Sequence, residues 1–437
     1  MENIIRYALS NGADEAEIFT RYTRINEART EGDKLKNDSK IIIETVIRIV
    51  VDKSITTAYL TTDSEDVIRD SINDLIGLAK NTPPDPYWEG LPYPKKPVKQ
   101  VNAWSSDLES IDQELLTNLT KKDLKYMKSK DNRVIPVSIK YSLYSTRYKV
   151  VNSNGVNVED RTNGFGYFID VKAKDESSES NTFGFKRSKT REIESEKVID
   201  ETVNRALELL RGVKLDKVYK GPVLMDPLAV SSTLYFSLAR VITGTAVQEG
   251  YSPLAKRLGE EIADKRLTIY DDGLLENGWN TRNYDEEGYP QQKTGIVVDG
   301  KLVGFIHNTY TARRMGVEST GNARRRESMI RVDITNLTIK PGSKDLDRLM
   351  SSYDELILVR NMPMGAHTIN YMTGSINMVG TEIYYVKKGS IEEVLKPLTI
   401  TGNIYEALTD IEIGNDVEDT FFNIYTPSIV FTKFTLA

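Results

Sequence analysis

A proline-rich segment between residues 81 and 101 divides the sequence. It contains six prolines, and proline neither donates a backbone hydrogen bond nor continues a helix, so this segment must run extended. Patterns typical of helices and strands stand on both sides of it. We therefore predict a linker at 81–101, with an α+β domain at 1–80 before it and a second α+β domain at 102–213 after it.

Each predicted α+β domain combines strand-like runs with amphipathic helices. Before the linker, Ile41 to Val51 is rich in β-branched residues and Ile55 to Thr61 follows as a hairpin partner. Apolar residues at helical spacing then indicate a helix from Thr62 to about Lys80. After the linker, the patterns predict a helix from about Leu108 to Lys128, three strands, and a helix from Ser195 to Leu210.

The remaining residues, 214–437, are dominated by short strand-like runs. Asp226 and Pro227 are an acidic cap and a first-turn proline, which predict the start of a helix that runs to about Ile242. We expect a mostly β domain here, built as a large curved mixed sheet that carries this long helix. The predicted fold class of the whole chain is α+β.

Composition excludes several classes of function. The 437 residues carry a net charge of −6 and include no cysteine. Disulfides, thiol nucleophiles and thiolate metal sites are therefore excluded, and there is no general attraction to nucleic acid or to anionic membranes. The N-terminal residues lack an apolar signal core and no run is long enough to span a membrane, so we expect a cytoplasmic protein.

An arginine-rich segment, Thr309 to Arg326, stands out in this acidic chain with five arginines. Arginine forks bind carboxylates and carbonyl oxygens in fixed geometry, and a Gly-Asn pair allows the main chain to turn and present its N–H groups. A solvated charged loop is the alternative interpretation. We predict a substrate-binding surface made of Arg313, Arg314, Gly321, Asn322, Arg324 and Arg325.

The same segment resembles a known family. Thr311-Ala-Arg-Arg-Met-Gly316 followed by Ser319-Thr-Gly-Asn-Ala-Arg-Arg325 is similar to the signature of the PmbA/TldD family, the modulators of DNA gyrase, whose biochemistry is that of a zinc metallopeptidase. The resemblance implies an incomplete barrel for the C-terminal domain. Further stretches follow in the family's order: Asn11-Gly-Ala-Asp-Glu-Ala-Glu17, Thr82-Pro-Pro-Asp-Pro86, Tyr284-Asp-Glu-Glu-Gly288, Thr373-Gly374, Ile400-Thr-Gly-Asn403 and Ile413-Gly-Asn-Asp416.

Metal-bearing members of this family carry His-Glu-x-x-x-His on the helix that corresponds to the one opened by Asp226. The two imidazoles hold zinc and the glutamate acts as base on the bound water. At the corresponding place this chain has Tyr235-Phe-Ser-Leu-Ala-Arg240, and its two histidines, His307 and His367, lie outside the helix. The sequence therefore resembles the PmbA (TldE-type) branch, which lacks the zinc motif.

This resemblance implies a subunit without its own catalytic or metal-binding residues. It would shape the peptide-binding cavity of a heteromeric metallopeptidase, inactive alone and active with a TldD-type homologous partner that holds the zinc. Peptides are the implied substrates, without direct nucleic-acid or membrane binding, and a homodimer is possible when the partner is absent.

Two other interpretations stay open. Asp271, Asp272, Asp285, Glu286 and Glu287 could form a carboxylate site, which would make the chain a self-sufficient metal-dependent hydrolase. The same residues also read as ordinary acidic turns, since Asp-Asp-Gly and Asp-Glu-Glu-Gly are common turn sequences. The other interpretation is a regulator linked to DNA gyrase without direct binding of DNA.

Overall fold

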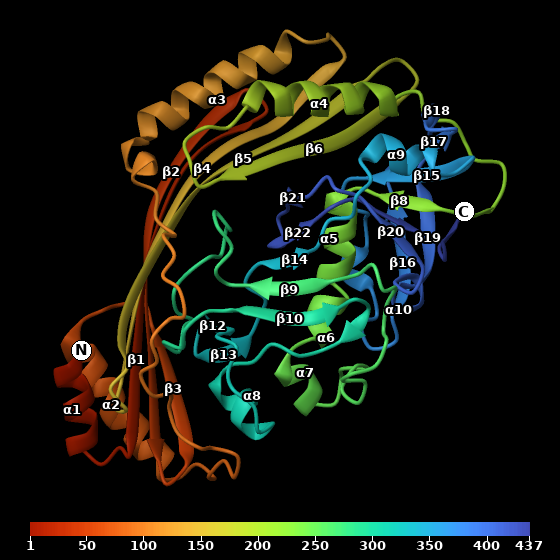
Figure 1. The fold of residues 1–437 in the computed structure, drawn as a ribbon. Coiled ribbons are helices and arrows are strands. Elements are labelled where there is room, and N and C mark those ends of the chain that lie inside the picture. Colours follow the sequence, from red (N-terminus) through yellow and green to blue (C-terminus); the bar gives the residue numbers. More distant parts are fainter.

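A long, curved antiparallel sheet forms the first half of the molecule (Figure 1). This computed structural model describes residues 1–437, and the sheet has the strand order β3-β2-β1-β4-β5-β6. Its strands are β1 (Glu15–Glu31), β2 (Lys34–Val51), β3 (Ser54–Leu60), β4 (Val134–Asn152), β5 (Asn157–Lys174) and β6 (Glu179–Ser188). All its strand pairs are antiparallel, and two-residue turns at 32–33 and 52–53 join β1 to β2 and β2 to β3.

This sheet contains strands from both sides of the proline-rich linker. β1, which precedes the linker, pairs with β4, which follows it, from Glu17–Asn152 to Arg29–Lys140. The helices nevertheless form two separate groups with separate apolar cores, one around Ile72 and one around Tyr141. The division into domains 1–80 and 102–213 stays a prediction, whereas the pairing of their strands in one sheet is observed.

The two groups of helices cover opposite ends of the convex face of this sheet (Figure 1). α1 (Glu2–Ser10) and α2 (Glu65–Ala79) lie at one end, and η1 (Ser106–Ser110), α3 (Gln113–Lys128) and α4 (Ser195–Leu209) lie at the other. The predicted helix over 108–128 is divided because the Asp112 side chain accepts a hydrogen bond from the Leu115 N–H at 2.7 Å and so starts α3. None of the helices combines the length and apolar character needed to cross a membrane.

The C-terminal half packs into the concave side of the long sheet and contains several smaller sheets, none closed into a barrel (Figure 1). The first has the order β11-β10-β9-β14-β22-β21, the second β18-β17-β15-β8-β23-β20, and the third β16-β19-β24-β7; β12 and β13 form a hairpin. The predicted α+β class with a mostly β C-terminal half is confirmed.

These strands and helices are mostly short. The strands are β7 (Tyr219–Lys220), β8 (Val223–Met225), β9 (Ile269–Asp272), β10 (Lys293–Val298), β11 (Lys301–Leu302), β12 (Ala323–Arg326), β13 (Met329–Val332), β14 (Leu337–Ile339), β15 (Glu355–Arg360), β16 (Ser375–Gly380), β17 (Glu382–Lys387), β18 (Ser390–Leu395), β19 (Leu398–Asn403), β20 (Ile411–Ile413), β21 (Glu418–Asp419), β22 (Ile424–Thr426), β23 (Ile429–Phe431) and β24 (Thr435–Leu436). The helices are α5 (Pro227–Tyr235), α6 (Leu238–Val241), α7 (Gly244–Gln248), α8 (Thr309–Arg314), α9 (Leu346–Ser351), η2 (Ala366–Thr368) and α10 (Ile404–Ala407).

The prediction of one long helix from Asp226 to Ile242 is wrong in its second half. The start is as predicted, since the Asp226 side chain accepts the Ala229 N–H at 2.8 Å and Pro227 is the first helical residue. The helix ends at Tyr235 because Ser237 adopts non-helical backbone angles, with φ −121° and ψ −89°. The Ser237 hydroxyl donates to the Thr233 carbonyl at 2.6 Å, a local bond that competes with continued helix.

Candidate functional site

The arginine-rich segment forms a short helix, a turn and a strand. Asn308 caps α8 by accepting the Thr311 N–H at 2.9 Å, and the Thr311 side chain accepts the Asn308 N–H in return. This reciprocal pair is a capping box, and it fixes the start of α8. The strand β12 then pairs with β13 in an antiparallel hairpin.

Arg313 and Arg314 both contact the proline-rich linker. The Arg313 guanidinium donates to the carbonyl oxygens of Glu89, at 2.9 Å, and Leu91, at 3.2 Å, and also to that of Gly90. The exposed Arg314 lies 4.1 Å above the ring of Tyr87. These two arginines therefore attach the extended linker to the C-terminal half, with Arg313 partly exposed and Arg314 exposed.

Gly321 and Asn322 lie in the interior. Gly321 has φ +76°, and a Cβ at this position would lie 2.4 Å from the Pro290 carbonyl oxygen, so only glycine fits. The Asn322 amide donates to Asp271, at 2.5 Å, and to the carbonyl oxygen of Asp333, at 3.0 Å. The turn predicted at this Gly-Asn pair is present, but the Asn322 side chain bonds within the chain and is 1% exposed.

Arg325 enters a buried charge network between the long sheet and the C-terminal half. Its side chain is 1% exposed and forms an ion pair with Glu17 of β1, whose side chain is also fully buried. Arg48 of β2 lies 2.9 Å from Glu17 and 3.1 Å from Glu287. It is therefore a second link between the long sheet and the C-terminal half. Glu286 accepts the Arg325 N–H at 2.6 Å.

Further arginines surround Glu286. Arg21 of β1 and Arg282 each lie 3.1 Å from its carboxylate, and Arg324 lies 3.5 Å away. We name Glu17, Arg21, Arg48, Arg282, Asp285, Glu286, Glu287, Arg324 and Arg325 the buried charge network.

Opposite charges and burial shift the pKa values of the carboxyl groups in this network. Burial raises the pKa of Glu17, but the guanidinium groups of Arg325 and Arg48 outweigh it, so the net pKa is lowered and the carboxylate stays ionised. Burial raises the pKa of Asp285 to about 8, with the neighbouring Glu287 adding to the effect. The sequence analysis missed Glu17 and Arg48, although one signal was present: Arg48 interrupts an apolar run in β2.

The carboxylates of the alternative hydrolase site do not gather at one surface. Asp271 bonds to Asn322 and accepts the Thr335 N–H at 2.7 Å, and burial raises its pKa to about 6. Asp272, on the same strand, lies 3.7 Å from Lys293. Asp285, Glu286 and Glu287 belong to the buried charge network. No group of three or more histidine or acidic side chains in the structure is arranged to hold a metal ion.

Aromatic and cationic side chains occupy the end of α5 and the start of α6. The rings of Tyr235 and Phe236 pack against Phe422, with centroids 4.8 Å and 5.6 Å away, and His367 lies 6.3 Å from Phe236. The exposed Arg240 lies 5.2 Å above the Tyr235 ring. We name these five residues the α5–α6 surface.

The second histidine, His307, is buried away from the α5–α6 surface. Its Nδ1 lies 3.2 Å from the Thr311 hydroxyl, and burial lowers its pKa to about 4, so the ring is neutral near pH 7. A Cβ at Gly244 would lie 2.2 Å from this ring, which therefore fills the space beside α7. His307 has the surroundings of a packed interior side chain.

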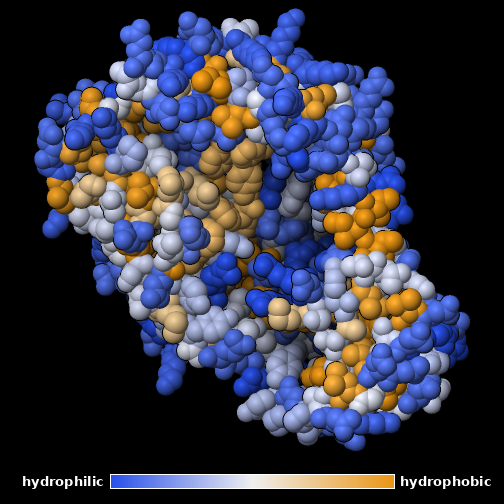
Figure 2. Space-filling model, turned by 180° about the vertical axis from the view of Figure 1, so that it is seen from behind, coloured by the Kyte–Doolittle hydropathy of each residue, from blue (hydrophilic) through white to orange (hydrophobic).

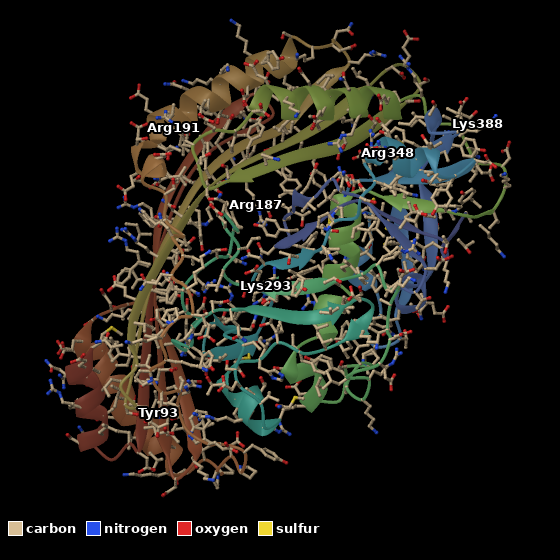
Figure 3. All side chains as sticks on the ribbon, in the orientation of Figure 1. Tyr93, Arg187, Arg191, Lys293, Arg348 and Lys388 are labelled. Carbon is tan, nitrogen blue, oxygen red and sulfur yellow. The ribbon has the colours of Figure 1, made fainter.

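A second junction between the long sheet and the C-terminal half lies at β6. Figure 3 shows Arg187 directed from β6 toward the C-terminal half, where it bonds to Asp419 at 2.7 Å and lies 4.9 Å above the Trp279 ring. Lys189 lies two residues after Arg187, and burial next to Arg187 lowers the pKa of Lys189 to about 7.

Seen from behind, the molecule has a hollow near its centre with hydrophobic side chains along one side (Figure 2).

Comparison with known proteins gives consistent matches. The family model of the PmbA/TldA metallopeptidase C-terminal domain matches residues 219–437, and that of the central domain matches residues 106–210. An uncharacterized protein of Methanocaldococcus jannaschii is 28% identical over 390 residues, covering 88% of this chain and 87% of its own. A metalloprotease of the same organism is 24% identical over 325 residues, covering 72% and 69%.

The crystal structure of TldE from Thermococcus kodakarensis superposes on the whole chain. Its TM-score is 0.94 at 24% sequence identity, and the match covers 100% of this chain and 99% of the other. At this identity the likeness establishes the fold. The family matches cover most of the chain, and together with the arginine-rich segment and the observed fold they show that the protein belongs to the PmbA/TldD family of metallopeptidases.

Proposed function

We propose that this chain is the non-metal-binding, TldE-type subunit of a heteromeric zinc metallopeptidase, located in the cytoplasm. The observation that supports this most directly is the α5–α6 surface, at the place where metal-bearing relatives are expected to hold zinc. Tyr235, Phe236 and Arg240 supply two aromatic rings and a permanent cation there. A guanidinium repels a metal cation, and neither ring is a zinc ligand of the kind found in catalytic sites.

In this proposal the zinc and the general base belong to a homologous partner with His-Glu-x-x-x-His. The chain's own contribution is the wall of the cavity in which a peptide is held. Aromatic rings flanked by an arginine offer apolar contact area to peptide side chains and a donor to a carboxylate. The α5–α6 surface therefore binds peptide or borders the partner's site.

A substrate-binding role for Arg313, Arg314, Gly321, Asn322, Arg324 and Arg325 stays a prediction. Among these, the exposed Arg314 is the side chain best placed to meet a peptide, since its guanidinium stacks on Tyr87 and has no carboxylate partner within the chain. The partly exposed Arg324 is the next, with one oxygen of Glu286 at 3.5 Å.

The test begins with the purified chain alone and then adds a homologue that contains His-Glu-x-x-x-His. We expect no stoichiometric zinc and no peptidase activity from the chain alone, and a stable heteromer with chelator-sensitive cleavage after mixing. Elemental analysis, light scattering and cleavage of an unstructured peptide measure the three quantities. One tightly held zinc per isolated chain with hydrolysis lost on chelation, or failure to bind the homologue at about micromolar concentration, contradicts the proposal.

The variant Arg240→Glu refines the test. It reverses the charge of an exposed side chain on the α5–α6 surface, so we expect unchanged folding and a loss of cleavage or assembly of about tenfold or more. The matched control is Arg348→Glu on α9, labelled in Figure 3, whose side chain is 75% exposed. Equal activity of both variants would count against a role for this surface.

A further inference from the structure

The first half of β2 is an exposed strand at the edge of the long sheet. Residues 34–44 pair with β1 on one side, whereas β3 covers only residues 45–51 on the other side (Figure 1). Most of these residues are exposed, including Ile41 at 61% and Ile42 at 36%. Natural proteins usually shorten or cover such an edge, because its free backbone groups are a template for another strand.

The register identifies which backbone groups are free. Two-residue turns make Glu31–Lys34 and Val51–Ser54 hydrogen-bonded pairs, so even-numbered residues of β2 bond to β1 and odd-numbered residues bond toward β3. Beyond the end of β3, the N–H and C=O groups of the odd-numbered residues have no partner elsewhere in the chain. These residues are Leu35, Asn37, Ser39, Ile41 and Ile43.

One antiparallel register satisfies all of these groups with a second copy of the same strand. With Ser39 opposite Ser39, Leu35 meets Ile43 and Asn37 meets Ile41, so every free residue faces another free residue. The pair has two-fold symmetry, the commonest symmetry of protein dimers.

The charges agree with this register. On the concave face Lys34 meets Glu44 and Asp38 meets Lys40, each pair occurring twice about the axis. Within one chain, Asp38 lies 2.8 Å from Arg29 and Glu44 lies 2.6 Å from Arg21, whereas Lys34 and Lys40 have no acidic partner. Lysines on an edge normally discourage pairing, but here each of these two finds an acid across the axis.

We propose that two copies of this chain associate through residues 34–44 of β2, paired antiparallel with Ser39 facing Ser39. The contact extends the long sheet across the dimer and leaves the α5–α6 surface free. It therefore does not depend on the proposed metallopeptidase partnership.

A charge exchange tests the register. Lys40→Asp places Asp38 opposite an acid in both halves, and Asp38→Lys places Lys40 opposite a lysine, so each variant alone should raise the dimer dissociation constant about fivefold or more. An equal mixture of the two variants restores opposite charges at both positions and should dimerise again as a mixed pair. The control is Lys53→Asp, the same charge change in the turn at the other end of β2, which should leave dimerisation unchanged.

A backbone variant tests the pairing itself. Ser39→Pro removes the central outward N–H and no backbone bond to β1. The one bond to β1 that it removes is the exposed one from the Ser39 hydroxyl to the Asn26 side chain, at 2.7 Å, so the fold should persist while the dimer is lost. Light scattering at up to about 100 μM and hydrogen exchange at two protein concentrations measure the two properties. The proposal is overturned if the wild-type chain stays monomeric in this range, if the mixed variants fail to pair, or if the edge is protected only after a homologous metalloprotease subunit is added.

Discussion

Replacing Arg325 by alanine tests whether the arginine-rich segment stabilises the junction between the long sheet and the C-terminal half. The Arg325 side chain is 1% exposed, pairs with Glu17 and donates to the Glu286 carbonyl oxygen at 2.9 Å. Removing one partner of a buried ion pair costs about 3–5 kcal/mol when the other is left unpaired. Because Arg48 remains 2.9 Å from Glu17, we expect the lower end, a loss of about 3 kcal/mol in the free energy of unfolding.

Urea denaturation followed by tryptophan fluorescence measures this loss, with Trp88 as a nearby reporter 5.3 Å from the Arg48 guanidinium. Arg326→Ala is the matched control in the same strand, since its side chain is 62% exposed and lies 3.5 Å from Asp333; it should change stability by less than about 0.5 kcal/mol. Combining Arg325→Met with Glu17→Gln removes both charges and should cost less than the sum of the single changes. Equal effects of the alanine variants at 325 and 326 would refute the reasoning.

Two further predictions concern the same region. The folded chain keeps a proton on Asp285 up to its pKa of about 8, whereas the unfolded chain releases it near the ordinary value of 3.8, so ionisation of Asp285 removes stability as pH rises through this window. The stability of Asp285→Asn relative to wild type should therefore increase from about pH 5 to pH 8 in urea titrations, and a constant difference would contradict the buried neutral carboxyl. Gly321→Ala should lower the free energy of unfolding by about 2 kcal/mol or more, because the new methyl group meets the Pro290 carbonyl. The control Gly316→Ala should lower it by only about 1 kcal/mol, because Gly316 has φ +68° but open space around it.

Local signals predicted several elements well. The β-branched run ending at Val51, the apolar stripe of α2 and the acidic cap with Pro227 each depend on neighbours within a few residues, and each is where the sequence placed it. The end of α5 at Tyr235 was not predicted, because the apolar pattern of a helix continues past Ser237. The backbone nevertheless leaves the helical conformation at Ser237, whose hydroxyl bonds back to the Thr233 carbonyl. Periodicity records which residues are apolar, but it does not record a hydroxyl that bonds back to a carbonyl.

The candidate site was harder to predict because its contacts join distant segments. Arg325 meets Glu17, and Arg48 meets both Glu17 and Glu287. In the sequence an arginine has the same appearance whether it faces solvent, a peptide or a buried glutamate. The composition of the arginine-rich segment indicated guanidinium recognition, but the nature of the acceptors depended on the topology that brings β1 beside β12.

Burial of so many charges at this junction has a consequence for how the two halves move. A buried ion pair contributes little net stability compared with apolar residues, but separating its partners without water leaves uncompensated charges and is costly. The junction through Glu17, Arg48 and Glu287 therefore resists sliding, since any displacement of the long sheet breaks several short contacts at once. The pair at β6, Arg187 with Asp419, is less completely buried, with side chains 9% and 26% exposed, and therefore costs less to open. If the C-terminal half moves relative to the sheet when a partner or peptide binds, the opening should occur at β6 while the buried charge network acts as the fixed end. Hydrogen exchange should then show faster amide exchange around β6 than around the start of β1, and the reverse order would refute this assignment of the hinge.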